Sequence, residues 1–113
     1  MKEKAIPETP DRAIQYIFDN GKVYAQARAN RIYMEEYRKS LKAMLMKRSL
    51  ESAIGAQERE AYAHPEYTQH LEALKISIEK EEELRWALIA AQARIEVYRT
   101  DSANARAEVR STI

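Results

Sequence analysis

The feature that most constrains the fold is a long run of helix-forming residues with very few helix breakers. The 113 residues include only two Gly and three Pro. Ala, Glu, Arg, Lys, Leu, Met and Gln dominate, and these residues have high helix propensities. Such a composition with helical periodicity is typical of long helices and coiled coils. We predict one all-α domain spanning residues 1–113: a long antiparallel helical hairpin, coiled-coil-like and oligomeric, with short helical pieces at the N-terminus and at the connection.

The expected helix boundaries follow from capping and breaking residues. Thr9 followed by a proline is a typical helix start. Asn20 and Gly21 predict a left-handed cap that ends the first helix. His64 precedes a proline and is therefore pushed out of the helical region, so that Pro65 opens the last helix. The predicted segments are a loose arm at residues 1–8, a short helix at 9–19, a long helix at 22–50, a short helix at 56–63 and a long helix at 65–110.

Apolar residues at intervals of three and four predict a packing stripe on each long helix. Asn30 lies in the first stripe, where a polar residue can fix the register between helices or is simply tolerated. The second stripe passes an acidic run, residues 79–83, and resumes in a shifted phase. Two helices leave apolar surface open, so we expect a homo-oligomer. The first stripe is Val23, Ala27, Met34, Tyr37, Leu41 and Met44, and the second begins Tyr67, Leu71, Leu74 and Ile78. The expected oligomer interface is Met34, Tyr37, Leu41, Leu84, Leu88, Ile95 and Tyr98.

Charge is sorted along the chain although the total is only +1. Residues 22–48 carry eight basic and two acidic side chains, a net of +6. Residues 51–83 carry nine acids and three bases, a net of −6, and residues 84–113 have a net of +2. Segregated charge of this kind indicates either self-association or a local electrostatic footprint.

The basic residues of the first long helix are candidate contacts for a single strand of nucleic acid. Arg28, Arg31 and Arg38 share a helix face with Lys42, and Tyr24 lies one turn earlier. Cations for phosphates and rings for bases are what such a strand requires. The alternative, of equal weight, is that this face pairs with the acidic segment of the next helix. The candidate nucleic-acid residues are Tyr24, Arg28, Arg31, Arg38, Lys39, Lys42, Lys47, Arg48, Arg99, Arg106 and Arg110.

The last three of these residues form a second basic stripe near the C-terminus. Small residues between the arginines would allow a phosphate to approach closely. Alternatively, the arginines offset the dipole at a helix end. Trp86 is the only tryptophan. It is a candidate partner-binding residue, although a core position is the simpler interpretation.

No catalytic motif is visible, and we expect a protein that is not an enzyme and that has no cofactor. The chain has no cysteine. His64 and His70 are six residues apart, so they do not share a helix face as metal ligands would. The acidic run is most simply a solvated face. No apolar run approaches the roughly 20 residues of a membrane span. We expect a cytoplasmic protein without a membrane partner.

Two resemblances accompany these patterns. The segments 56–63, AQEREAYA, and 99–108, RTDSANARAE, resemble small helical proteins from the replication and recombination regions of tailed phages. The overall plan resembles the UvsY recombination mediators of T-even phages. The corresponding parts here are residues 24–50, 51–66 and 67–109. The resemblance implies an oligomer that binds single-stranded DNA and helps to load a recombinase on strands covered by single-strand-binding protein.

The leading functional expectation is therefore an accessory factor of phage DNA recombination, acting as a scaffold in the infected bacterial host. One alternative is a phage inhibitor of a host nuclease or immune effector, in which the acidic run and Trp86 would occupy a basic groove. Another is a structural coiled-coil assembly protein with no role in nucleic-acid binding.

Overall fold

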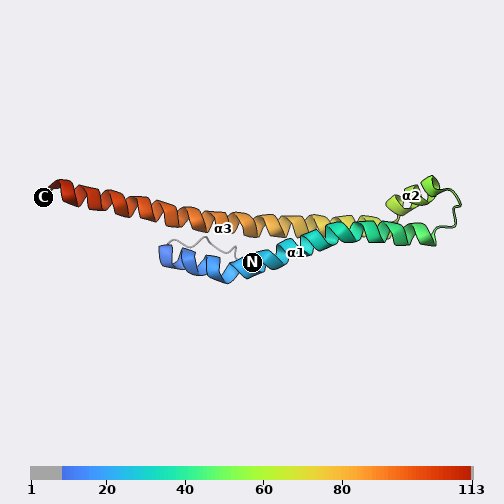
Figure 1. Ribbon diagram of the computed structural model, residues 1–113, viewed down its shortest axis with the longest axis horizontal. Coiled ribbons are helices and arrows are strands. Elements are labelled where there is room, and N and C mark those ends of the chain that lie inside the picture. The colour runs from blue at the N-terminus through green and yellow to red at the C-terminus, as the bar shows by residue number, and fades with distance from the viewer. Residues whose placement is uncertain (1–8, 113) are drawn as a thin grey trace. The chain divides into compact units, whose positions relative to one another are not determined.

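The computed structural model describes residues 9–112, which form three helices (Figure 1). They are α1 (Pro10–Arg48), α2 (Ile54–Ala63) and α3 (Pro65–Thr112). No strand occurs between residues 9 and 112, and the predicted all-α class is confirmed. The predicted N-terminal arm at residues 1–8 lies outside the described residues.

The chain divides into two compact units. Unit 1 comprises Met1–Tyr24 with Glu83–Ile113, and unit 2 comprises Ala25–Glu82. Helices α1 and α3 each contribute one part to each unit. The cations predicted on the first long helix lie almost entirely in unit 2, and the C-terminal arginines lie in unit 1.

The predicted break at Asn20 and Gly21 is wrong, because α1 runs through both residues without interruption. No residue from 9 to 112 has a positive φ angle, so Gly21 is not a left-handed cap. The amide of Asn20 donates to the carbonyl of Tyr16 at 2.9 Å and stays within the helix. A helical glycine costs only about 1 kcal/mol relative to alanine. The buried residues Ala13 and Ala27 on either side offset this cost through packing.

The predicted helix starts at Thr9 and Pro65 are confirmed. The hydroxyl oxygen of Thr9 accepts a hydrogen bond from the amide of Arg12 at 3.3 Å. His64 has an extended backbone, and its Nδ1 atom accepts a hydrogen bond from the amide of Glu66 at 3.1 Å. Both side chains satisfy amide groups that have no partner within the helix.

The core of unit 2 lies where the end of α1, α2 and the start of α3 meet. It consists of Leu41, Leu45, Ala61 and Tyr67, each less than a tenth exposed. The ring of Tyr62 meets the ring of Tyr67 edge to face at a centroid distance of 5.3 Å. Each buried leucine contributes up to about 1.5–3 kcal/mol to stability. Helix α2 therefore does more than connect the long helices, because it covers the end of their apolar stripe.

The stripe of α3 does not shift phase in unit 2, which corrects the sequence-based expectation. Leu71 and Ile78, two predicted stripe residues, are 39% and 41% exposed. The buried positions include Leu74, Ser77 and Glu81. Their spacing of three and four is that of a continuous stripe. The stripe passes through the acidic run because polar groups of α1 satisfy the buried Ser77 and Glu81.

The packing in unit 1 relies on small side chains. Ala13 of α1 and Ala91 of α3 are fully buried. The first turns of α1 and the later turns of α3 line a shared groove of about 350 Å³. Its lining residues are Pro10, Asp11, Ile14, Ile95, Tyr98, Arg99, Ser102 and Arg106.

Candidate functional site

Arg31, a predicted nucleic-acid residue, forms an ion pair inside unit 2. Its guanidinium donates to both carboxylate oxygens of Glu81, at 2.5 and 2.9 Å, and also to Glu35 at 3.1 Å. The Glu81 side chain is only 7% exposed. The hydrogen bond with Glu81 raises the pKa of Arg31 above its ordinary value. Arg31 therefore supplies the buried carboxylate of Glu81 with a cationic partner inside the fold.

Asn30 contributes to the same polar layer between α1 and α3. Its side-chain amide donates to the hydroxyl of Ser77 at 3.4 Å. Ser77 is 8% exposed. Asn30 and Arg31 are consecutive on α1, and their partners Ser77 and Glu81 lie one turn apart on α3. A polar layer of this kind penalises any register in which its members lose their partners.

Lys42, another predicted contact, is also held by the fold. Its ammonium group donates to Glu58 of α2 at 2.7 Å and lies 4.7 Å from the ring centre of Tyr62. The hydrogen bond to Glu58 is the main cause that raises the pKa of Lys42. Because the pKa is raised, the stabilisation is present at neutral pH and is lost only as the pH rises through the folded-state pKa. The contact ties α1 to α2.

Two further cations of α1 have acidic partners at the surface. Arg48 donates to Glu66 of α3 at 2.9 Å, and Lys39 donates to Glu36 at 3.2 Å. Exposed pairs of this kind contribute between zero and about 1 kcal/mol. Three cations of α1 are therefore paired with acids of α2 and α3 in the structure: Arg31, Lys42 and Arg48.

A basic and aromatic groove of about 650 Å³ lies along α1 and α2. Arg38 makes no ion pair with any residue between 9 and 112. Lys39 is three-quarters exposed, and Tyr62 is 47% exposed. These groups combine exposed cations with an accessible ring. The groove is lined by Arg38, Lys39, Lys42, Ala43, Met46, Tyr62 and Tyr67.

The remaining predicted contacts are not gathered in this groove. Tyr24 is half-buried and belongs to unit 1, whereas Arg28 is exposed in unit 2. Lys47 lines a different pocket of α1. In unit 1, Arg99 and Arg106 line the groove at the start of α1. Arg106 also lines an apolar surface pocket of about 440 Å³ together with Ala105, Val109 and Arg110.

The predicted oligomer-interface residues differ in how accessible they are. Leu41 is 6% exposed and belongs to the chain's own core, where a second copy cannot reach it. Tyr98 is 55% exposed in unit 1. Trp86, the predicted partner-binding residue, is 59% exposed, and its ring lies 5.2 Å from the guanidinium of Arg85. The half-buried interface residues are Met34, Tyr37, Leu84, Leu88 and Ile95.

The sequence interpretation missed the aromatic side of the groove. Tyr62 lies in a helix that we treated only as part of a connection, and Tyr67 was assigned only to the stripe of α3. The available signal was the pair of tyrosines five residues apart on either side of Pro65. A proline at the start of α3 makes the chain turn there, so the two rings can meet.

His70 has a structural role between the helices of unit 2. Its Nε2 atom donates to the carbonyl oxygen of Met34 at 2.7 Å, and its ring lies 5.4 Å from that of Tyr37. Across residues 9–112, no group of three or more His, Cys, Asp and Glu side chains is placed to hold a metal ion. Within the same part of the chain, no helix is long and apolar enough to cross a membrane.

Comparisons of the chain with protein-family models, with curated proteins and with solved structures found no match.

Proposed function

We propose that this chain is a non-enzymatic accessory factor of phage DNA recombination that binds single-stranded DNA in the groove between α1 and α2. Arg38 and Lys39 would contact phosphates, and the ring of Tyr62 would contact a base. The observation that carries the proposal is the position of Arg38, a cation without an ion pair between residues 9 and 112, in a groove that also contains an exposed tyrosine. Binding of this type depends on phosphate charge and is tolerant of sequence.

The ion pairs narrow the proposed binding surface. If Arg31 turned away to bind DNA, the buried carboxylate of Glu81 would lose its cationic partner, which is costly. Lys42 is engaged with Glu58, so its charge contributes less to an incoming phosphate. The proposal therefore depends on Arg38, which has no ion pair between residues 9 and 112, and on Lys39, whose pair with Glu36 is exposed and weak.

A second candidate is a structural helical protein without a nucleic-acid ligand. The observation in its favour is that three cations of α1 pair with acids of α2 and α3. The opposite charges of the two segments would then serve folding alone.

Fluorescence anisotropy with a labelled thymidine oligonucleotide, measured over a series of salt concentrations, separates the two candidates. Each phosphate contact on a single strand adds about 0.7 to the slope of log affinity against log salt. We expect Arg38→Ala with Lys39→Ala to weaken binding and to flatten the slope by about 1.4. The melting temperature should hardly change, because both side chains are exposed.

Lys75→Ala with Lys80→Ala is the matched control, because it removes the same charge from exposed positions of α3. This variant should retain the affinity and most of the salt slope of the wild type. Equal losses of DNA affinity in the two double variants would show that only net charge matters, which would contradict binding in the proposed groove. A wild-type protein that does not bind the oligonucleotide at low salt would favour the structural candidate.

A further inference from the structure

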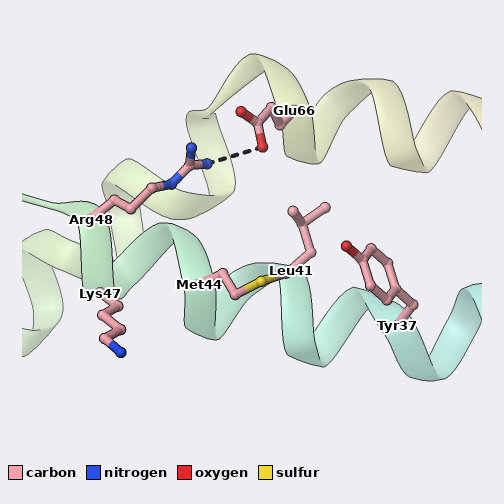
Figure 2. Close-up of a pocket in the computed structure, with 6 residues that line it drawn as sticks. All are labelled: Tyr37, Leu41, Met44, Lys47, Arg48 and Glu66. Atoms are coloured by element: carbon pink, nitrogen blue, oxygen red, sulfur yellow. Dashed lines mark hydrogen bonds and ion pairs between the residues drawn. The ribbon is translucent and has the colours of Figure 1, made fainter.

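A second pocket of unit 2 shares no lining residue with the DNA groove. It has a volume of about 430 Å³ and lies between the last turns of α1 and the start of α3. Figure 2 shows the side chains of Tyr37 and Leu41 rising from α1 towards α3, with Met44 beside them. The three side chains give the pocket an apolar floor. Met44 is 45% exposed, so this floor is open to solvent.

The rim of the pocket is basic. Arg48 uses one N–H group in its hydrogen bond to Glu66, which Figure 2 marks with a dashed line. A guanidinium has five such donors and can bind a second carboxylate without releasing the first. Lys47 makes no ion pair with any residue from 9 to 112. Lys47 lines the pocket, and in Figure 2 its long side chain extends away from Arg48 and Glu66.

The charges around the pocket indicate which class of ligand it can bind. Two cations and one carboxylate leave a net positive rim around an apolar floor. A purely apolar ligand would make no ion pair with the basic rim. A nucleic-acid strand would place its phosphates next to the carboxylate of Glu66 and the apolar side chain of Met44, which is unfavourable. A peptide with an apolar side chain beside carboxylates satisfies both parts, because the side chain fills the floor while the carboxylates meet Lys47 and Arg48.

We infer that this pocket docks an acidic segment of a partner protein, in which a large apolar side chain lies next to a run of carboxylates. The apolar side chain packs on Met44 and on the ring of Tyr37. The carboxylates bind Lys47 and the free donors of Arg48. The pocket is thus an anchor for a protein, separate from the groove proposed for DNA.

The test is the anisotropy of a fluorescein-labelled peptide of four aspartates followed by a leucine, titrated with the full-length protein. We expect saturable binding with a Kd below roughly 1 mM, as suits a short peptide with one anchor. Lys47→Glu should weaken binding about tenfold, and Met44→Ser should do the same through loss of the apolar floor. A peptide with serine in place of leucine should bind about tenfold more weakly to the wild type.

Two controls make the outcome decisive. Lys75→Glu introduces the same charge change on α3 and should leave the peptide affinity unchanged. Arg38→Ala with Lys39→Ala should also leave it unchanged, even where DNA binding is lost. No saturable binding by the wild type would overturn the inference. So would equal binding by wild type and Lys47→Glu together with a lower melting temperature of the variant, because Lys47 would then serve only the C-terminal end of α1.

Discussion

At the scale of single residues, the buried carboxylate of Glu81 governs how the basic helix is used. A charge in this position is tolerated only with a partner, and the two hydrogen bonds from Arg31 satisfy it. The sequence pattern placed Glu81 in a solvated acidic run and Arg31 on a DNA-binding face. Both assignments were made within a single helix, and such patterns do not show that the two side chains lie opposite each other when α1 and α3 pack together. Their contact removes Arg31 from the proposed binding surface.

We predict that Arg31→Leu alone will lower the melting temperature, because it leaves the carboxylate of Glu81 buried without its cation. Arg31→Leu combined with Glu81→Leu should recover most of the loss, since a packed apolar pair often replaces a buried ion pair without cost. Thermal denaturation followed by circular dichroism checks both variants. A double variant less stable than the single one would contradict this prediction, because Glu81 would then stabilise the fold even without Arg31.

At the scale of elements, the unbroken course of α1 is the main departure from the sequence-based expectation. A helix that contains a glycine continues when packing on both sides exceeds the propensity loss of about 1 kcal/mol. Apart from its chain neighbours and the adjacent backbone of its own helix, Gly21 has no atom within 4 Å of the position that a Cβ would occupy, and its φ angle is not positive. The glycine therefore has no steric requirement that alanine would violate.

Gly21→Ala should stabilise the protein by about 0.5–1 kcal/mol, through higher helix propensity and a less flexible unfolded chain. Chemical denaturation with urea measures the change. Had Gly21 been a left-handed cap, the same substitution would be destabilising, so the sign of the effect separates a continuous helix from a capped one.

The helices of unit 1 pack through alanines, which gives a second prediction at this scale. Ala91 is fully buried, and a larger side chain there must displace its neighbours. Ala91→Leu should therefore cost about 1–3 kcal/mol in unfolding free energy. Ala93→Leu, at an exposed position two residues away, is the control and should be close to neutral. Equal stability of the two variants would contradict the packing described for unit 1.

At the scale of the whole molecule, the apolar core is thin. Four of the eight buried apolar residues are alanines, and no large side chain described in residues 9–112 is less than 2% exposed. Large apolar side chains remain open on both units, among them Phe18 at 83% and Tyr33 at 66% exposed. A chain of this size with so small a core gains stability by covering such residues with another protein surface.

We therefore predict that the protein is an oligomer at micromolar concentration. Tyr98→Glu combined with Val109→Glu should shift it towards the monomer, because both residues are more than half exposed on α3 of unit 1. Light scattering coupled to size exclusion gives the mass, and circular dichroism should report an unchanged helix content. Ala93→Glu, at an exposed position of α3 outside the predicted interface, serves as a control. A wild-type protein with the mass of one chain across the whole concentration range would refute the prediction.

The sequence by itself determined the helical class, the helix start at Thr9 and the turn at Pro65. These features depend on local propensity, capping groups and the steric effect of proline, all of which act within a few residues. The opposite net charges of the two long segments were also visible in the sequence. The groove was only partly predictable, since its cations were identified but its tyrosines were not.

Only the tertiary structure decided which cations are available and whether the helix breaks at Gly21. Arg31 and Glu81 are fifty residues apart, and their contact exists only because α1 and α3 pack in one register within unit 2. The same packing buries Leu41 and places Tyr62 beside Lys42. Helical periodicity places a side chain on a face of its own helix, but the element opposite that face is set by long-range packing, which local sequence does not specify.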